Sequence, residues 1–397
     1  MSVADRERLI NGGAGTSSGT GIRLGSFVLN PLLLIDSQYN DNIFATDTGR
    51  RGDVFLTAHP EVALRSDFGR NAIAGRAYFE RSFHAKYQGE DVSQYGGAID
   101  GRYDISRSTR LTGGVSFDHA AESRGSLGTF RQTAKPAEFS STVAAAALAQ
   151  DFGSLSLSAG GRVRTLRYSD ALLGATRVDQ TYRDLNIVGG TLSAGYGFHE
   201  LTRLIVVADV ERRRYVLRPG EPGFDPVTSI DRSADGFRIE AGVSRELSAL
   251  ITGSLRVGYI RYDYTDTRLR DIGGFSYFGD LDWRVTPLTT ITASASRRLD
   301  ETTSPVTAGN LRDEVRLRVD HELLRRLVLN ADVRYASIRP SGAFANSREF
   351  ELSAGARYYI GRNLRIQAEL RRSQRDSRDR NIAFRSNAVL IGLRLAR

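Results

Sequence analysis

The sequence predicts an all-β chain that forms a transmembrane, antiparallel, up-and-down β-barrel of about 18 strands. Three observations carry this prediction. Apolar and polar residues alternate with a period of two, short and long connections alternate along the chain, and no apolar run approaches the roughly 20 residues that a spanning helix needs. The mean hydropathy of −0.32 agrees with strands that are apolar on one face only.

The alternation is clearest in the C-terminal half of the chain. In 327–335, Leu, Leu, Ala, Val and Tyr occupy the odd positions, whereas Asn330, Asp332 and Arg334 lie between them. In 364–371 the apolar residues alternate with Arg, Gln, Glu and Arg in the same way. Successive side chains of a strand point to opposite faces, so each segment has one apolar and one strongly polar face. A sandwich, a propeller and a β-helix fit this pattern and the strand count less well.

The connections give the order of the strands. We predict eight tight turns at 66–69, 106–109, 151–154, 199–202, 246–248, 286–289, 323–326 and 361–363. Between them we predict nine longer polar loops near 42–52, 86–92, 121–137, 169–180, 217–233, 264–271, 300–309, 339–347 and 374–381. These connections join eighteen strands and leave both termini at the short-turn end. Bacterial barrels have short periplasmic turns and long extracellular loops, which predicts the cell outer membrane with both termini periplasmic.

The predicted barrel spans 25–397, and the Gly- and Ser-rich residues 1–24 are predicted to be a flexible, periplasmic N-terminal tail. The first residues lack the apolar core of a signal peptide, so we expect a mature or trimmed chain. The loops are all of modest length, which favours a pore without an inward-folded constriction loop.

Composition limits the chemistry. Cysteine is absent, which excludes disulfides and thiolate sites, and 53 of the 55 basic residues are arginines spread beside acidic residues rather than clustered, which argues against nucleic acid. The five histidines are scattered without metal-ligand spacing. We predict no catalytic, metal or cofactor site. The alternative weighed was an outward Ser–His pair, formed by His119 with Ser116 or Ser123.

The polar faces predict the lining of a wide, water-filled lumen, because charges at this density cannot face hydrocarbon. The predicted pore-lining residues are Arg76, Arg162, Arg164, Asp209, Arg213, Arg238, Glu240, Arg256, Asp280, Asp282, Glu314, Arg316, Arg318, Asp332, Arg334, Glu351, Arg357, Arg365, Glu369 and Arg371. For each residue taken singly, bracing of the barrel wall by an ion pair is the competing interpretation.

The apolar faces predict two aromatic bands at the membrane interfaces. Phe152, Tyr196, Phe198, Trp283 and Tyr358 fall beside turns, and Phe117, Tyr259, Tyr335 and Phe350 fall toward loops. Outward-facing Arg212, Arg261, Arg297 and Arg372 also lie near loops, where phosphates of lipopolysaccharide, the expected lipid partner, would pair with them. Strand extension beyond the membrane is the alternative.

The opening of the chain resembles a family of outer-membrane β-barrel porins. A Gly-x-Arg-x-Gly-x-Phe stretch at 21–27 with Pro31 precedes Tyr-Asn-Asp-Asn-Ile-Phe at 39–44, and Thr-x-Leu turns recur at 109–111 and 202–204. The resemblance covers 21–397. It implies the outer-membrane pore of exopolysaccharide or capsule export, with a polysaccharide cargo and a periplasmic polysaccharide export protein as partner. The end at Arg397 departs from the aromatic residue with which barrel chains commonly close.

Three hypotheses follow. The first is a polysaccharide-export porin that acts as a passive conduit. The second is a general or solute-specific diffusion porin. The third is a non-conducting barrel scaffold whose surface loops bind a partner. Conductance in planar bilayers separates the first two from the third.

Overall fold

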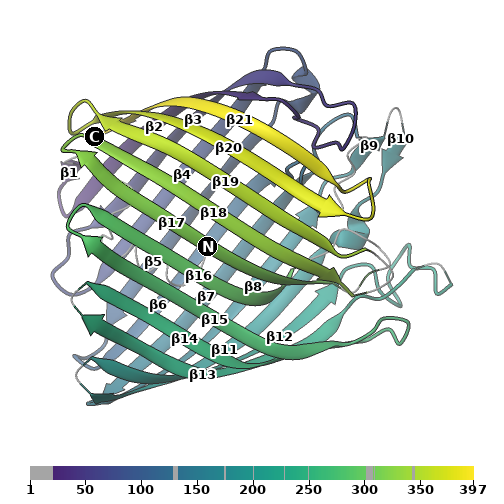
Figure 1. Ribbon diagram of the computed structural model, residues 1–397. Helices are drawn as coiled ribbons and strands as arrows, with labels where there is room; N and C mark the ends of the chain where they lie inside the picture. The colour runs from purple at the N-terminus through teal and green to yellow at the C-terminus, as the bar shows by residue number, and fades with distance from the viewer. Residues whose placement is uncertain are drawn as a thin grey trace.

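The computed structural model describes residues 21–397 except 128–132, 174–175, 200, 228, 249, 301–306, 308 and 342–344. Within this part of the chain, eighteen of the nineteen strands in one antiparallel sheet close into a barrel (Figure 1). The predicted fold class is therefore confirmed. Among the described residues, no helix has the length and apolar character needed to cross a membrane.

The barrel strands are long and follow one another around the wall. They are β2 (Phe27–Asn40), β3 (Asp53–Ser66), β4 (Ala72–His84), β5 (Ser93–Asp104), β6 (Thr109–Ala121), β7 (Glu138–Phe152), β8 (Leu155–Tyr168), β11 (Leu185–His199), β12 (Thr202–Tyr215), β13 (Ala234–Ser248), β14 (Ile251–Tyr264), β15 (Ile272–Thr286), β16 (Thr289–Asp300), β17 (Asn310–Leu324), β18 (Leu327–Pro340), β19 (Ser347–Tyr359), β20 (Leu364–Ser377) and β21 (Phe384–Ala396).

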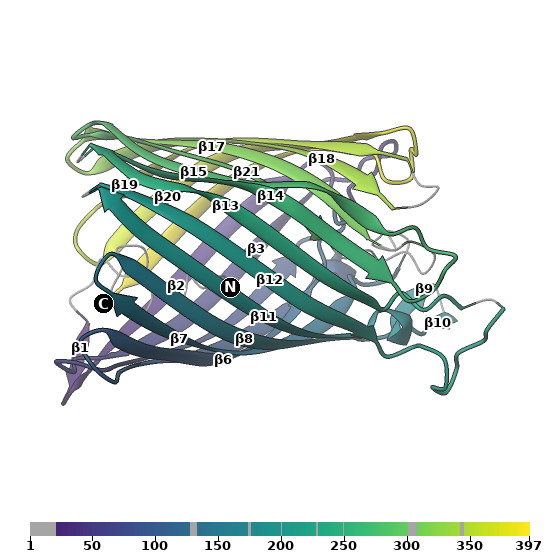
Figure 2. The same cartoon turned by 90° about the horizontal axis from the view of Figure 1, so that it is seen from below.

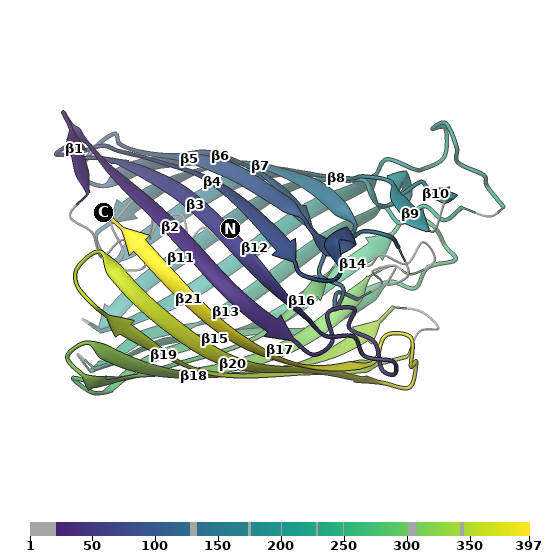
Figure 3. The same ribbon diagram turned by 90° about the horizontal axis from the view of Figure 1, so that it is seen from above.

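The first and last barrel strands form the seam. β2 and β21 pair antiparallel from Leu32 with Ala396 to Asn40 with Ala388. Figures 2 and 3 show the tilted strands from two further sides, and in Figure 3 the purple β2 lies beside the yellow β21. Closure leaves no barrel strand with an unpaired edge, which is what a lipid environment demands of a sheet.

The connections alternate as predicted. The short ones join β3–β4, β5–β6, β7–β8, β11–β12, β13–β14, β15–β16, β17–β18 and β19–β20. Both ends of the described chain lie at the short-turn end of the barrel. The N–H of Asp67 bonds there to the carbonyl of Ser26, and the N–H of Ala396 bonds to that of Asn363.

The N-terminal boundary differs from the predicted one by a few residues. Residues 1–20 of the predicted tail lie outside the described residues. Residues 22–24 form β1 (Ile22–Leu24), which pairs with the start of β2 through a turn at Gly25 with φ of 59°. This hairpin extends the wall at the turn end, and the closed barrel begins at Phe27.

The loop end of the barrel carries additional local structure. Two 3₁₀ turns, η1 (Gln88–Glu90) and η2 (Thr181–Arg183), and a small hairpin of β9 (Ala171–Leu173) and β10 (Thr176–Val178) lie in the loops. Two apolar clusters are buried there. One contains Leu166, Leu185, Ile187 and Tyr215, and the other contains Ile260, Tyr262, Leu269, Ile272 and Leu299. In the second cluster, Leu269 of the β14–β15 loop packs against strand residues of the rim through the same burial of apolar surface that stabilises a soluble core.

Candidate functional site: the polar inner face of the barrel

The inner face of the wall is identified by contacts that pass over an entire strand. Tyr262 on β14 donates a hydrogen bond of 2.9 Å from its hydroxyl to Glu211 on β12, although β13 runs between them. Such contacts form on the concave side of a barrel, where side chains of neighbouring strands converge. The opposite face carries exposed apolar residues such as Leu192, which is 62% exposed.

A glycine on the intervening strand makes this close approach possible. A Cβ atom at Gly236 would lie 2.3 Å from Cδ1 of Tyr262, so any larger residue would displace the ring. Gly96 on β5 leaves room in the same way for a hydrogen bond of 3.0 Å from the hydroxyl of Tyr78 on β4 to Oδ1 of Asp118 on β6. Gly189, Gly258 and Gly392 lie beneath the bridges Arg162–Glu211, Glu240–Ser276 and Asp36–Gln367. The inner face is thus bound together laterally as well as through the strand ladder.

All twenty predicted pore-lining residues lie on the inner face of the strands. The structure brings ten of them together as ion pairs with N–O distances of 2.6–3.4 Å. These pairs are Asp209–Arg238, Glu240–Arg256, Arg316–Asp332, Arg334–Glu351 and Glu369–Arg371. Both interpretations weighed from the sequence are compatible with this arrangement, because paired charges brace the wall and also face the lumen. That solutes pass these residues stays a prediction.

The other ten use different partners. Arg162 and Arg213 share Glu211, Arg318 and Arg357 share Asp320, and Glu314 accepts from Arg312. Asp280 and Asp282 accept hydrogen bonds from the hydroxyls of Ser254 and Thr292. Arg164 donates to Ser141, Arg365 donates to Gln367, and Arg76 lies over the ring of Tyr78. The inner face thus contains both charged and neutral partners of these residues.

Sequence reasoning missed the carboxylates that organise these charges. Three carboxylates, those of Glu211, Asp320 and Glu349, each form ion pairs with two arginines from two different strands. The arginine pairs are Arg162 with Arg213, Arg318 with Arg357, and Arg312 with Arg375. Glu211 and Glu349 stand in runs where charged residues occupy both faces, such as 211–214, so that alternation alone hides them. For Glu211 the signal that could have found it is a glycine opposite it on each neighbouring strand, Gly189 and Gly236. Asp320 and Glu349 lack this signal, because their contacts with Arg357 and Arg312 cross β18, a strand that contains no glycine.

The β6–β7 loop folds into the mouth of the barrel. Arg124, which is only 4% exposed, donates to both carboxylate oxygens of Glu90 at 2.6 and 2.9 Å and to the carbonyl of Thr133. On the other side of the loop, Glu122 pairs with Arg183, whose guanidinium stacks 3.8 Å from the ring centre of Tyr168. Two buried ion pairs therefore hold the loop from both flanks.

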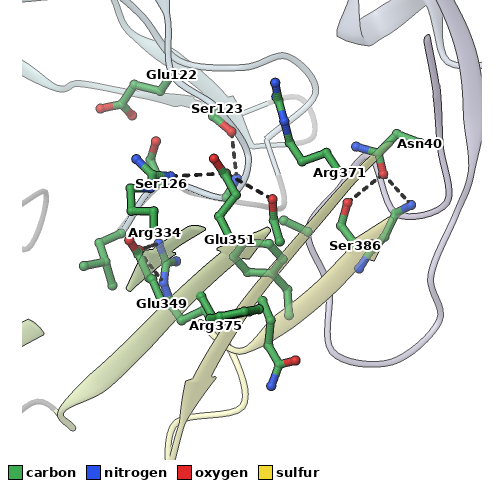
Figure 4. Close-up of a pocket in the computed structure, with 18 of the residues that line it drawn as sticks. Asn40, Glu122, Ser123, Ser126, Arg334, Glu349, Glu351, Arg371, Arg375 and Ser386 are labelled. Atoms are coloured by element: carbon green, nitrogen blue, oxygen red, sulfur yellow. Dashed lines mark hydrogen bonds and ion pairs between the residues drawn. The ribbon is translucent and has the colours of Figure 1, made fainter. Parts of the chain in front are cut away.

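The inserted loop bounds a cavity of about 750 Å³ at the loop end of the lumen. Ser123, Gly125, Ser126 and Leu127 line it from the loop, and residues of β2, β3, β8 and β16–β21 line it from the wall. Figure 4 shows Glu122, Ser123 and Ser126 across from Arg334, Glu349 and Arg375. Arg375 donates to Glu349 through its Nε at 3.0 Å, and its guanidinium lies 5.3 Å from the ring centre of Phe384.

This loop corrects one expectation. Its modest length predicted a pore without an inward-folded loop, but Gly125 packs against Phe384 of β21 (3.1 Å from a Cβ placed at Gly125 to Cζ). Strands β2 to β5 separate β6 from β21 in the wall. A loop of this length reaches the interior because it turns inward at the rim, where the ion pair of Arg124 with Glu90 holds it. The spacing of residues in the sequence does not indicate that Glu90 is the partner of Arg124.

The nine predicted interface aromatics are all exposed. Those expected beside turns lie near the turn end, and those expected beside loops lie nearer the loop end. Of the four outward arginines, Arg212, Arg261 and Arg297 pair with Asp235, Asp263 and Asp313. Arg372 has no such partner among the described residues. Contact of these residues with lipid stays a prediction.

His119 is not paired with either serine that the sequence suggested. Its Nδ1 lies 3.1 Å from the hydroxyl of Ser140 on β7, and its ring stacks on Tyr95. Ser116 points to the other face of the same strand, since it lies an odd number of residues from His119. Its register partner Ala98 lies on the inner face of β5, whereas Tyr95, the partner of His119, lies on the outer face. Ser123 lines the cavity inside the barrel.

The comparisons with known proteins agree with this architecture. The OccK2 (OpdF) structure from Pseudomonas aeruginosa in complex with glucuronate is similar, with 14% identity, 95% of this chain and 100% of that chain covered, and a TM-score of 0.50. A BenF-like porin from Pseudomonas fluorescens Pf-5 has 13% identity, 93% and 98% coverage and a TM-score of 0.49. The likeness to OccK2 (OpdF) concerns the fold alone. No curated protein matches the chain.

A family model covers nearly the entire chain. The model described as "Putative beta-barrel porin 2" matches residues 18–397, which include every strand of the barrel. Together with the closed barrel and its charged inner face, this match identifies the chain as a member of that β-barrel porin family and as a porin of the outer membrane.

Proposed function

We propose that this porin conducts hydroxyl-rich solutes and that its cargo is an exopolysaccharide or capsular polysaccharide leaving the cell. The observation that carries the proposal is a line of hydroxyl side chains on the inner face of β16, formed by Thr290, Thr292, Ser294 and Ser296. It runs from the turn end toward Arg298 at the cavity. Closely spaced weak donors and acceptors let a sugar chain exchange hydrogen bonds as it moves, without a deep binding minimum.

The orientation and the partner belong to the same proposal. Both termini lie in the periplasm, and a periplasmic polysaccharide export protein docks at the short-turn end. The support is the asymmetry of the connections, since outer-membrane barrels keep their short turns periplasmic. The resemblance of the N-terminal motif to export-associated porins supports the partner.

A solute-selective diffusion porin is the second candidate. The cavity between the β6–β7 loop and the wall favours it, because about 750 Å³ is the size of a small-molecule site. Such a porin would admit small solutes that carry acidic and hydroxyl groups, which the paired arginines of the cavity wall can bind.

The test compares secretion with uptake. A deletion strain is complemented with the wild type, with the variant Thr292→Val, Ser294→Ala, Ser296→Ala, or with a control that changes the outward side of the same strand, Ala293→Ser, Ala295→Ser. We expect the deletion and the inner-face variant to lose secreted polymer while the control restores it. Intact secretion with impaired uptake of small solutes would establish the second candidate instead, and absence of conductance in planar bilayers would exclude both.

A further inference from the structure

An arginine patch covers the outward face of β16–β21 at the loop end. It consists of Arg297, Arg339, Arg348, Arg372 and Arg385, each within five residues of the loop end of its strand. Their outward direction follows from alternation with exposed apolar residues, for example Arg372 with Leu370 and Arg385 with Val389. All but Arg297 are exposed.

Two of the five arginines share one carboxylate. Nε of Arg297 and Nη2 of Arg339 lie 2.5 and 2.7 Å from the oxygens of Asp313, which also accepts 3.0 Å from the hydroxyl of Tyr277. Two positive charges thus converge on one negative charge. The group keeps a net positive charge, and the exposed guanidinium of Arg339 keeps donors that Asp313 does not use.

The other three arginines have no carboxylate within 4.0 Å among the described residues. Asp376 lies opposite Arg348 in the strand register, but the amide of Gln374 holds its two oxygens at 2.8 Å. Asp313 and Asp376 are acidic residues of this surface, and Asp41 adjoins it, because its carboxylate accepts hydrogen bonds from Asn387, the register partner of Arg372. Five arginines against these three carboxylates leave an excess of positive charge. On the inner face of the same strands, by contrast, most of the arginines have a carboxylate partner, and Arg365 donates to the neutral Gln367 instead.

The patch lies beside the aromatic band of the loop end. Tyr335 and Phe350 are register partners on β18 and β19, both are exposed, and Gln374 and Arg385 continue the same row. Aromatic side chains of this kind mark the level of the lipid headgroups. Guanidinium groups at the level of the lipid headgroups are stabilised by anions. Phosphate suits them, because it accepts two parallel charge-assisted hydrogen bonds from one guanidinium.

We propose that the arginine patch binds the phosphate groups of a phosphorylated glycolipid in the leaflet at the loop end. The inference rests on the orientation given under the proposed function, in which the loop end faces outward. Arg348, Arg372 and Arg385 supply the free charges, and the Arg297–Asp313–Arg339 group fixes one border of the site. The glycolipid remains bound through its phosphates whatever solute the lumen conducts.

The experiment measures lipid retained by the full-length barrel. Detergent-solubilised protein is titrated with lipopolysaccharide, with the same lipopolysaccharide after enzymatic dephosphorylation, and with phosphatidylethanolamine, and bound lipid is counted by native mass spectrometry. The test variant is Arg348→Gln, Arg372→Gln, Arg385→Gln. The matched control removes three exposed arginines of the short-turn end, Arg107→Gln, Arg326→Gln, Arg362→Gln.

We expect the wild type and the control to prefer phosphorylated lipopolysaccharide and the test variant to bind it about tenfold or more weakly. A lysine version of the three positions should recover part of the affinity, because it restores charge without the bidentate geometry. Equal retention in test and control variants would overturn the proposal, as would a change of oligomeric state in the test variant, which would assign the patch to a second copy of the chain. Conductance measured on the same samples keeps this result separate from the proposed function.

Discussion

At the scale of single residues, the inner face depends on positions where a side chain is missing. Gly236 lies directly beneath the ring of Tyr262, so that the hydroxyl of this ring reaches Glu211 across β13. We predict that Gly236→Ala lowers the stability of the barrel by about 1–3 kcal/mol, because the added methyl displaces the ring and costs it the hydrogen bond. Urea unfolding of the protein in lipid vesicles measures this difference.

The matched control for this variant is Gly101→Ala on the outward face. The atom nearest to a Cβ at Gly101 is 3.9 Å away, which is an ordinary contact. We expect Gly101→Ala to unfold at the same urea concentration as the wild type. A Gly236→Ala barrel as stable as the control would mean that the bridge between Tyr262 and Glu211 contributes nothing.

The β14–β15 loop contains a carboxylate with a depressed pKa. Hydrogen bonds from Arg268 lower the pKa of Asp266 from 3.8 to about 2, and the same arginine donates to the carbonyl of Ser229 in the neighbouring loop at 2.6 Å. Because the folded pKa is the lower one, this stabilisation is present above pH 4 and is lost as the pH falls toward 2.

We therefore predict that the contact between these two loops persists at pH 4 in the wild type and is already weakened at neutral pH in Asp266→Asn. Hydrogen exchange of the amides in 229–233 and 265–271 across this pH range checks it. Identical exchange in both proteins at pH 7 would contradict the prediction.

The sequence predicted which face of a strand a residue occupies, but not which residues of other strands it contacts. Alternation predicted the face of Asp332 and Arg334, because their neighbours Ala331, Val333 and Tyr335 are apolar. It could not predict that Glu349 accepts from Arg312 on β17, because β18 lies between them. Such pairs depend on curvature and on the size of the side chain in the middle strand, and neither is encoded in the period of two.

At the scale of elements, the β6–β7 loop enters the mouth of the barrel and lines the cavity there. We predict that Arg124→Ala releases it, because removing one partner of a buried ion pair costs about 3–5 kcal/mol. Cleavage of the loop by proteinase K, whose broad specificity does not depend on the arginine removed, should accelerate at least about tenfold, and single-channel conductance should rise.

Arg110→Ala provides the comparison. Its ion pair with Asp104 is exposed at the turn end, and exposed pairs contribute about 1 kcal/mol or less. Unchanged conductance in Arg124→Ala, with the loop cleaved faster, would show that the loop does not narrow the pathway.

Strands were predictable from sequence and the loop path was not. Eighteen strands follow from alternation and turn spacing, even across Pro31, which lies just before the first β2–β21 pair at Leu32 and so removes no bond from that ladder. The course of 122–127 depends on Glu90 in a different loop and on Phe384 in the last strand. Contacts between segments so far apart leave no periodic pattern in either one.

At the scale of the whole molecule, the two faces of the wall face different solvents. Leu192 and Ser193 are neighbours on β11 and point outward and inward. We predict that Leu192→Arg destabilises the barrel by about 2–4 kcal/mol in vesicles, because the charge enters hydrocarbon, whereas Ser193→Arg stays within about 1 kcal/mol of the wild type. Unfolding of both variants in urea measures the difference, and equal losses would argue against a lipid-facing exterior.

The seam between β2 and β21 brings the two ends of the barrel together. The N–H of Arg397 bonds to the carbonyl of Pro31 at 3.1 Å, so residues separated by almost the entire chain are direct neighbours. A circularly permuted gene that joins position 397 to position 27 through a short linker and opens the β7–β8 turn would omit β1 but preserve every strand pair of the closed barrel. The order in which the strands are synthesised is then free to change while the closed cylinder stays the same.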